Sequence, residues 1–130
     1  MFIAQKKKWS DAQAKCRSLG GFVAEPSTED ENDFLKKIMS NHSQIRMWIG
    51  GNDQTKNDQW MWVNAGTLVN NGYTDWAPGQ PDDAWTDEYC MELIQWKHGS
   101  NELRWNDGRC WWEHSFVCQK SVTRMGGAGQ

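Results

Sequence analysis

The sequence predicts a single domain of the mixed α+β class, with two short helices, several short strands and one long loop. Three observations support this prediction. A length of 130 residues suits one hydrophobic core. Two stretches place apolar residues at helical spacing behind helix start signals, and short runs rich in Trp, Ile and Val are typical of strands. Residues 66–87 are rich in Gly, Asn, Asp and Pro without periodicity, and a loop of that length often carries a ligand site.

Both helices are predicted in the first third of the chain. The first begins at a capping-box sequence, residues 10–13, and ends at the glycine pair 20–21. The second begins at residues 27–30, behind a proline, and ends near residue 41. The side chains expected to face the core are Ala12, Cys16, Leu19, Phe34, Leu35, Ile38 and Met39.

The predicted strands are short and lie mainly in the second half of the chain. They cover residues 2–3, 47–49, 60–63, 89–94 and 115–119, and a turn is expected at 64–66. The domain is predicted to span 1–121. A Gly-rich tail, 122–130, is expected to be disordered.

Composition and charge exclude several classes of function. The net charge is −3, and residues 57–96 contain seven Asp and Glu but no Lys or Arg. A short basic run, residues 6–8, is better explained as a solvated face than as a phosphate patch, so no nucleic-acid partner is expected. No apolar run approaches the roughly 18 residues that cross a bilayer, so no membrane insertion is expected.

The four cysteines indicate the compartment. They form no CxxC pair, and in a small chain this pattern favours disulfides and a secreted, extracellular protein. The start of the chain is too short for the apolar core of a signal peptide. We therefore expect the sequence to be a mature or trimmed chain.

A set of oxygen-bearing side chains in the acidic region predicts a metal site. Gln80, Asp82, Glu88, Asn106 and Asp107 offer carboxylate and amide oxygens, without Cys or His among them. Such hard ligands suit Ca²⁺, which takes six to eight oxygens in irregular geometry. Three carboxylates roughly balance one divalent cation and leave room for a neutral polar ligand.

The order of helices, strands and motifs resembles the C-type lectin-like domain. The matching segments are Trp9 to Cys16, Trp48-Ile-Gly-Gly51, Gln80-Pro-Asp82, Glu88-Tyr-Cys90, Trp105-Asn-Asp107 and Phe116-Val-Cys118. The resemblance covers residues 2 to about 121 and implies a double-loop α+β domain with small antiparallel sheets. Its chain ends would pair as strands, and its long loop would carry the ligand site. Four cysteines allow three pairings, and the resemblance implies Cys16–Cys118 with Cys90–Cys110.

The resemblance also implies how the oxygen ligands work. A cis bond before Pro81 would direct Gln80 and Asp82 toward one Ca²⁺, which Glu88, Asn106 and Asp107 complete, while two sugar hydroxyls coordinate the same ion. The amides of Gln80 and Asn106 would donate hydrogen bonds to those hydroxyls, and Asp82 and Glu88 would accept them. The order Gln-Pro-Asp goes with galactose or N-acetylgalactosamine in this family.

Two further features of the loop are left open by the sequence. Trp85 is either the aromatic platform on which a galactose ring stacks or a residue that closes the loop. A second Ca²⁺ is implied at Asp53, Asn57, Asp83 and Glu88, although Asn57 stands where the family has a carboxylate. The alternative for Asp53 is a cap of a turn at residues 51–53.

The sequence also bears on functions other than sugar binding. His42, His98 and His114 are far apart, expected at the surface and outside any catalytic motif, so no enzyme activity is expected. The main alternative is a domain of the same fold that binds a protein partner or a mineral. A single open site would bind monosaccharide weakly, so a homo-oligomer with several sites is an open expectation.

Overall fold

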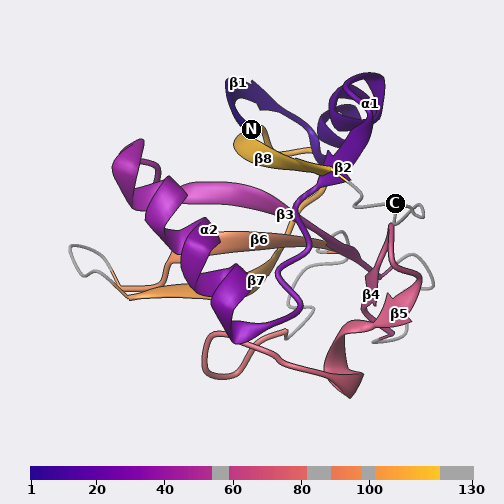
Figure 1. Cartoon of the computed structure of the whole chain (residues 1–130). Coiled ribbons are helices and arrows are strands. Elements are labelled where there is room, and N and C mark those ends of the chain that lie inside the picture. The colour runs from indigo at the N-terminus through magenta and orange to yellow at the C-terminus, as the bar shows by residue number, and fades with distance from the viewer. Residues whose placement is uncertain (54–58, 82–88, 98–101, 121–130) are drawn as a thin grey trace.

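The computed structural model describes residues 1–53, 59–81, 89–97 and 102–120. Two helices and a branched sheet make up this part of the chain (Figure 1). Its elements are β1 (Phe2–Lys7), α1 (Trp9–Ser18), β2 (Gly21–Val23), α2 (Glu29–Asn41), β3 (Arg46–Asn52), β4 (Met61–Trp62), β5 (Thr67–Leu68), a 3-10 turn (Val69–Asn71), β6 (Cys90–Gln95), β7 (Leu103–Gly108) and β8 (His114–Lys120). The predicted α+β class is confirmed.

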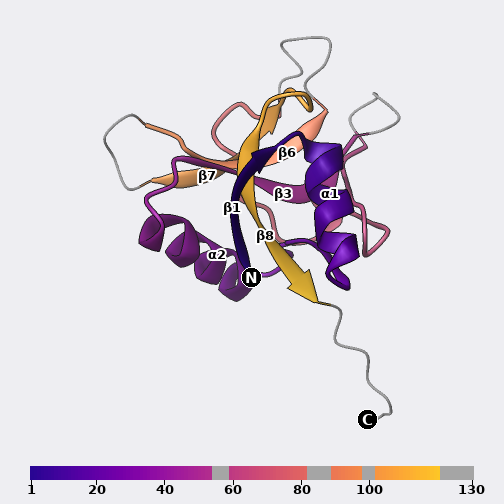
Figure 2. The ribbon, with the colours of Figure 1, turned by 90° about the horizontal axis from the view of Figure 1, so that it is seen from above.

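The sheet is built around β3 and β8. β8 pairs antiparallel with β1 and, near its end, with β2, and it pairs parallel with β3. β3 in turn pairs antiparallel with β4 and with β6, and β6 continues to β7. Figure 2 shows β1 and β8 side by side, with α1 on one side of them and α2 on the other. Neither described helix has the length and apolar character needed to cross a membrane.

The core consists of two clusters of buried side chains. One lies between α2 and strands β3, β6 and β7, and it includes Leu35, Met39 and Trp105. The other lies under α1 and includes Trp48 and the Cys16–Cys118 disulfide. Trp48, Trp60, Trp62 and Trp105 are buried, and Trp76 is partly buried. Tryptophan therefore supplies much of the volume of a core that is poor in Leu and Val.

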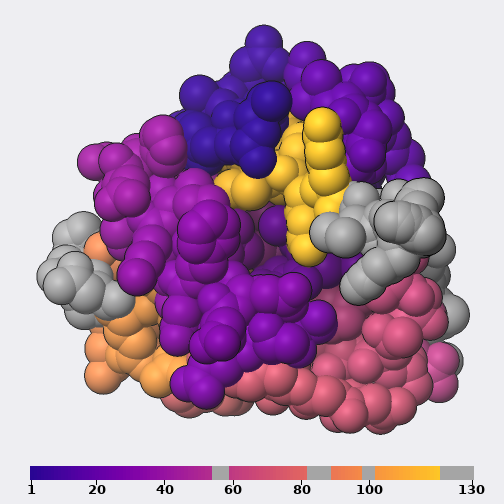
Figure 3. All heavy atoms as spheres, in the orientation of Figure 1, coloured from indigo at the N-terminus to yellow at the C-terminus, as the bar shows by residue number. Residues whose placement is uncertain are grey.

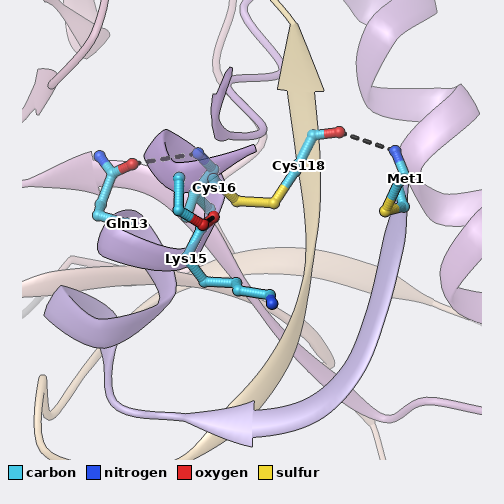
Figure 4. Close-up of a disulfide and its surroundings, with 7 residues drawn as sticks. Met1, Gln13, Lys15, Cys16 and Cys118 are labelled. Carbon is cyan, nitrogen blue, oxygen red and sulfur yellow. Dashed lines mark hydrogen bonds between the residues drawn. A yellow bond between two sulfur atoms is a disulfide. The ribbon is translucent and has the colours of Figure 1, made fainter. Parts of the chain in front are cut away.

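Both predicted disulfides are present. Cys16 on α1 is joined to Cys118 on β8, and Cys90 on β6 is joined to Cys110 just after β7. Beside the first bridge, the amino group of Met1 donates to the carbonyl of Cys118 over 2.8 Å (Figure 4). The two ends of the described chain are thus held together at β1 and β8.

Helix α1 starts differently from its prediction. It begins at Trp9, one residue before the expected capping box, and Lys8 stands at the cap position without a side-chain hydrogen bond. The backbone N–H of Trp9 donates to the carbonyl of Cys110, and its indole N–H donates to the carbonyl of Ile49. Long-range contacts therefore take over the role that a capping side chain has at an isolated helix.

Helix α2 follows its prediction at the start but not at Phe34. The Thr28 hydroxyl accepts the N–H of Glu31, as expected for a capping residue. Leu35 and Met39 are buried, whereas Phe34 is 66% exposed. Phe34 lies at the rim of a hollow of about 400 Å³ that α2 forms with β1 and β8. Figure 3 shows the atoms of α2 (purple) on the front face, below those of β1 (indigo) and beside those of β8 (yellow).

Three short strands were not predicted: β2, β5 and β7. The turn at residues 51–53, which was the alternative interpretation of Asp53, is not formed, because Gly51 and Asn52 belong to β3. His114 was expected at the surface but is buried, with its ring 4.3 Å from that of Trp48. The prediction of a disordered tail concerns residues outside the described part of the chain.

Candidate functional site

The predicted calcium ligands fall partly within the described structure. Gln80, Asn106 and Asp107 are described, whereas Asp82 and Glu88 lie outside the described residues, as does the candidate stacking residue Trp85. Of the second predicted metal set, Asp53 is described; Asn57, Asp83 and Glu88 are not. The described members come from three places: the end of β7, the segment that follows the 3-10 turn, and, for Asp53, the end of β3.

Strand β7 presents Asn106 and Asp107. It pairs with β6 over six positions, with Asn106 opposite Glu92 and Asp107 opposite Met91. Directly opposed residues share a face of the sheet and successive residues alternate. Asn106 therefore lies half-buried on the Glu92 face, and Asp107, which is 1% exposed, lies on the other.

Gln80 is brought to the outer edge of β7 by a tight turn. The segment before it runs along β7, since the N–H of Trp105 donates to Asp75 and the N–H of Ala77 donates to Trp105. The N–H of Gln80 then donates to the carbonyl of Ala77 over 2.9 Å. Gly79 has a φ of +81°, as position i+2 of a type II turn requires after proline. This turn ends in the Gln80–Pro81 peptide bond, which is cis, as the resemblance implied.

Asp75 fixes this segment to α2 and β7. Its carboxylate accepts from Asn32 Nδ2 (2.8 Å) and forms ion pairs with Lys36 (2.8 Å) and Arg104 (2.7 Å). Hydrogen bonds to Glu102 and Asp75 raise the pKa of Arg104 above its ordinary value, so this partner keeps its charge. The start of the Gln80 turn is therefore tied to two elements by one carboxylate.

Tryptophan rings form the floor beneath the same segment. Trp105 is fully buried, and the rings of Trp62, Tyr73 and Trp76 meet it edge-on at 5.3 to 5.9 Å. Its indole N–H donates to Asn32 Oδ1 over 2.9 Å. These edge-to-face contacts anchor the segment that contains Tyr73 and Trp76 on the buried ring of Trp105.

Asp53 lies where β3 meets the beginning of β6. It is fully buried, and its N–H donates to the carbonyl of Tyr89 over 2.9 Å. Asn52 pairs with Cys90, whose disulfide to Cys110 closes the β6–β7 end. This arrangement sets Asp53 beside the residue that follows Glu88 in the sequence.

The donor chemistry of the described residues fits a hard cation. Gln80, Asn106 and Asp107 offer amide and carboxylate oxygens, which Ca²⁺ prefers. Within the ranges that the structure describes, no three His, Cys, Asp or Glu side chains gather into a metal-binding group. Any ion at this end would therefore depend on Asp82 and Glu88 as well.

A buried polar cluster next to Asn106 was missed by sequence reasoning. Glu92 is fully buried on β6 and is contacted by Arg46, Asn106 and His114. Nothing in the strand sequence marks Glu92 as buried, because glutamate ordinarily faces solvent. Only the pairing of β6 with β7 shows that Glu92 lies opposite Asn106.

Comparisons with known proteins agree with this architecture. The family model described as the lectin C-type domain matches residues 5–120, nearly all of the described chain. The chain belongs to the C-type lectin domain family. This is a lectin-type family rather than a family of enzymes.

Individual C-type lectin relatives are similar at about the same level. Perlucin from Haliotis laevigata is 30% identical, over 92% of this chain and 74% of its own. The protein named galactose-specific lectin nattectin, from Thalassophryne nattereri, is 33% identical over 88% of this chain and 68% of its own. The solved structure of the herring type II antifreeze protein superposes with a TM-score of 0.77 at 31% identity, covering 95% of this chain and 90% of that one. Some relatives are longer, and this C-type lectin domain spans only 39% of their length.

Proposed function

We propose that this domain binds terminal galactose or N-acetylgalactosamine through a bound Ca²⁺. The observation that carries the proposal is the ordered donor set: Gln80 and Asp82 on either side of Pro81, then Glu88, Asn106 and Asp107. The segment that leads into the Gln80 turn runs along β7, the strand that carries Asn106 and Asp107. The name of nattectin, a galactose-specific relative, supports the same sugar class.

The protein groups have distinct roles in this proposal. When bound, Ca²⁺ would supply coordination positions for two neighbouring sugar hydroxyls. Gln80 and Asn106 would each donate an amide N–H to a hydroxyl, because amides carry both a donor and an acceptor. Asp82 and Glu88 would accept the hydroxyl protons. Asp107, held in the buried end of β7, would add a carboxylate ligand.

Other parts of the proposal follow from the same reading. Trp85 would stack against the apolar face of the sugar, and Asp53, Asn57, Asp83 and Glu88 would hold a second, structural Ca²⁺. Two disulfides within 130 residues support secretion to an oxidising compartment. A single open site would bind weakly, so several copies of the domain would be needed for firm attachment to a glycan surface.

A second candidate function is binding of a protein partner or a mineral surface. It is favoured by the structural similarity to the herring antifreeze protein, whose name records an activity other than sugar binding. In that case the C-type lectin fold would be retained while Gln80 and its neighbours contact no sugar.

Retention on galactose-agarose and on mannose-agarose, in Ca²⁺ and then in EDTA, tests the proposal. We expect retention on galactose that EDTA reverses. Retention on mannose alone would keep the ion and contradict the sugar preference. Absence of retention on both resins would favour the second candidate function.

The donor order can be tested in the same assay. The double variant Gln80→Glu with Asp82→Asn exchanges acid and amide across Pro81 while keeping the ligand count. We expect its preference to move from galactose toward mannose. Unchanged selectivity would mean that surrounding loop residues, and not the donor order, decide the sugar.

A further inference from the structure

Glu92 is a fully buried carboxylate directly beside a proposed calcium ligand. It lies on β6, opposite Asn106 on β7, and Asn106 Nδ2 donates to Glu92 Oε2 over 2.8 Å. Arg46 Nη1 lies 3.3 Å from both carboxylate oxygens, and His114 Nε2 lies 2.8 Å from Oε1. A buried charge is tolerated only when it is paired and hydrogen-bonded, and these three partners meet that requirement.

The Glu92 contact decides which way the Asn106 amide faces. A primary amide has a donating nitrogen at one end and an accepting oxygen at the other, and a flip exchanges them. An ionised carboxylate only accepts hydrogen bonds. The nitrogen must therefore face Glu92, since the flipped amide would set two oxygens against each other. The Asn106 oxygen is left on the side away from Glu92.

Glu92 is itself held in place from two sides. A Cβ atom on residue 108 would lie 2.8 Å from Glu92 Cδ, so the absence of a side chain at Gly108 leaves room for the carboxylate. On the other side, the Arg46 guanidinium lies 5.1 Å from the centre of the Trp112 ring. Burial and contacts with three side chains therefore confine the Glu92 carboxylate.

We propose that Glu92 is a positioning residue of the ligand site, which holds Asn106 with its carbonyl oxygen directed to the cation. The inference rests on the proposed function. The charge-assisted hydrogen bond also draws electron density onto the Asn106 oxygen, which makes it a stronger cation ligand. One N–H of Asn106 is used by Glu92, and the other remains to donate to a sugar hydroxyl.

A double-mutant cycle on Ca²⁺ affinity tests this role. The variants are Glu92→Gln, Asn106→Ala and both together, titrated with Ca²⁺ by calorimetry. We expect Glu92→Gln to weaken Ca²⁺ binding about tenfold or more, as for other residues that orient metal ligands. In the Asn106→Ala background the same change should have no further effect, because Glu92 acts through Asn106. A purely structural role would give equal effects in both backgrounds and overturn the proposal.

A readout on the ion-free protein is independent of Ca²⁺ binding. The Asn106 side-chain NH₂ pair, followed by nuclear magnetic resonance, should show one proton protected from exchange in the wild type and none in Glu92→Gln. Unprotected protons in the wild type would overturn the proposal. If Glu92→Gln fails to fold, Glu92→Asp retains the charge beside Arg46 but withdraws it from Asn106, and the same loss of protection and affinity is expected.

The outcomes separate this inference from the proposed function. A wild type that binds Ca²⁺ alongside a Glu92→Gln variant of equal affinity overturns the positioning role alone. A wild type that binds no Ca²⁺ overturns both.

Discussion

Asp75 connects three parts of the molecule through one buried carboxylate. It contacts Asn32 and Lys36 on α2 and Arg104 on β7, while its own backbone carbonyl accepts from Trp105. Lys36 and Arg104 are partly exposed and regain water if the carboxylate is removed, whereas the fully buried Asn32 does not. Asn32 also contacts Tyr73 and Trp105, so the main cost of losing Asp75 is one unsatisfied buried N–H group.

We expect Asp75→Ala to lower the free energy of unfolding by about 2 kcal/mol, the usual cost of leaving one buried polar group unsatisfied. Urea denaturation measures this difference. Asp33→Ala is the matched control, because Asp33 is an exposed acid on α2, the helix that Asp75 contacts, and its removal should change little. Equal effects of the two variants would mean that the Asp75 contacts contribute nothing beyond a surface charge.

Glu25 is expected to make the free energy of unfolding depend on pH. Burial raises the pKa of its carboxyl above the ordinary value of 4.5, and the N–H groups of Asn64 and Ala65 and the charge of Arg17 offset this only in part. The folded state therefore holds the proton more tightly than the unfolded chain does. Between the ordinary pKa and the raised one, the Glu25 contribution to stability increases as the pH falls.

The Glu25→Gln variant tests that sign. Measured in EDTA, the free energy of unfolding of the wild type relative to Glu25→Gln should rise between about pH 7 and about pH 4.5. Glu113→Gln, at an exposed position, should show no such trend. A relative stability of Glu25→Gln that improves on acidification would contradict a raised pKa.

At the level of helices and strands, local signals predicted those elements whose own sequence favours them. The Thr28 cap and the Leu35–Met39 spacing suffice for α2, and the Met47–Ile49 run suffices for β3. β7 was missed because Asn106, Asp107 and Gly108 are types that strands disfavour. Pairing with β6 over six positions outweighs that preference, and no local pattern discloses it.

For the candidate site, the sequence indicated individual residues but not the contacts between them. Both disulfides were implied by motifs that resemble a known family and are present in the structure, and the same motifs led to the proposed donor residues. The contacts that hold those donors did not follow from motifs, because Asp75 and Glu92 work across sequence separations of 29 and 14 residues, to Arg104 and Asn106. The burial of Phe34 and of His114 was predicted wrongly for the same reason. Whether each side chain is exposed depends on which other helices and strands pack against it.

The two disulfides are expected to act on different properties. Cys16–Cys118 spans 102 residues and Cys90–Cys110 spans 20. On the chain-entropy model, replacing a pair by alanine lowers the free energy of unfolding by about 4.7 kcal/mol for the long loop and about 3 kcal/mol for the short one. Gly108 pairs with Cys90 and directly follows Asp107. We therefore expect only the short-loop variant to lose more Ca²⁺ affinity than its lower stability explains.

Chemical denaturation gives the stabilities, and Ca²⁺ titration below the unfolding transition gives the affinities. The Cys16→Ala/Cys118→Ala variant is the control for general loosening of the fold. If it loses as much Ca²⁺ affinity as the Cys90→Ala/Cys110→Ala variant, the short bridge has no special relation to the site.

Over the whole molecule, charge is distributed unevenly. Residues 57–96 carry seven acidic side chains and no Lys or Arg, although the net charge of the chain is only −3. A cation that binds this region would relieve repulsion in the folded state but find no preformed site in the unfolded chain. Binding of the ion should therefore raise the free energy of unfolding of the whole domain.

We expect Ca²⁺ at about 100 times its dissociation constant to raise the free energy of unfolding by about 2.7 kcal/mol. Differential scanning calorimetry with and without Ca²⁺ measures the change. Mg²⁺ at the same concentration should give much less, because it prefers strict octahedral geometry and retains its water. Identical melting curves in Ca²⁺ and EDTA would contradict a specific calcium site.

The rings around Trp105 also have an optical consequence. Trp62, Tyr73 and Trp76 meet Trp105 nearly at right angles within 6 Å, and Trp105 directly precedes Asn106 and Asp107. Aromatic chromophores this close in a fixed chiral arrangement couple their electronic transitions and give a strong near-ultraviolet circular dichroism band. The protein thus carries an intrinsic, label-free reporter whose signal originates one residue away from the proposed ligands.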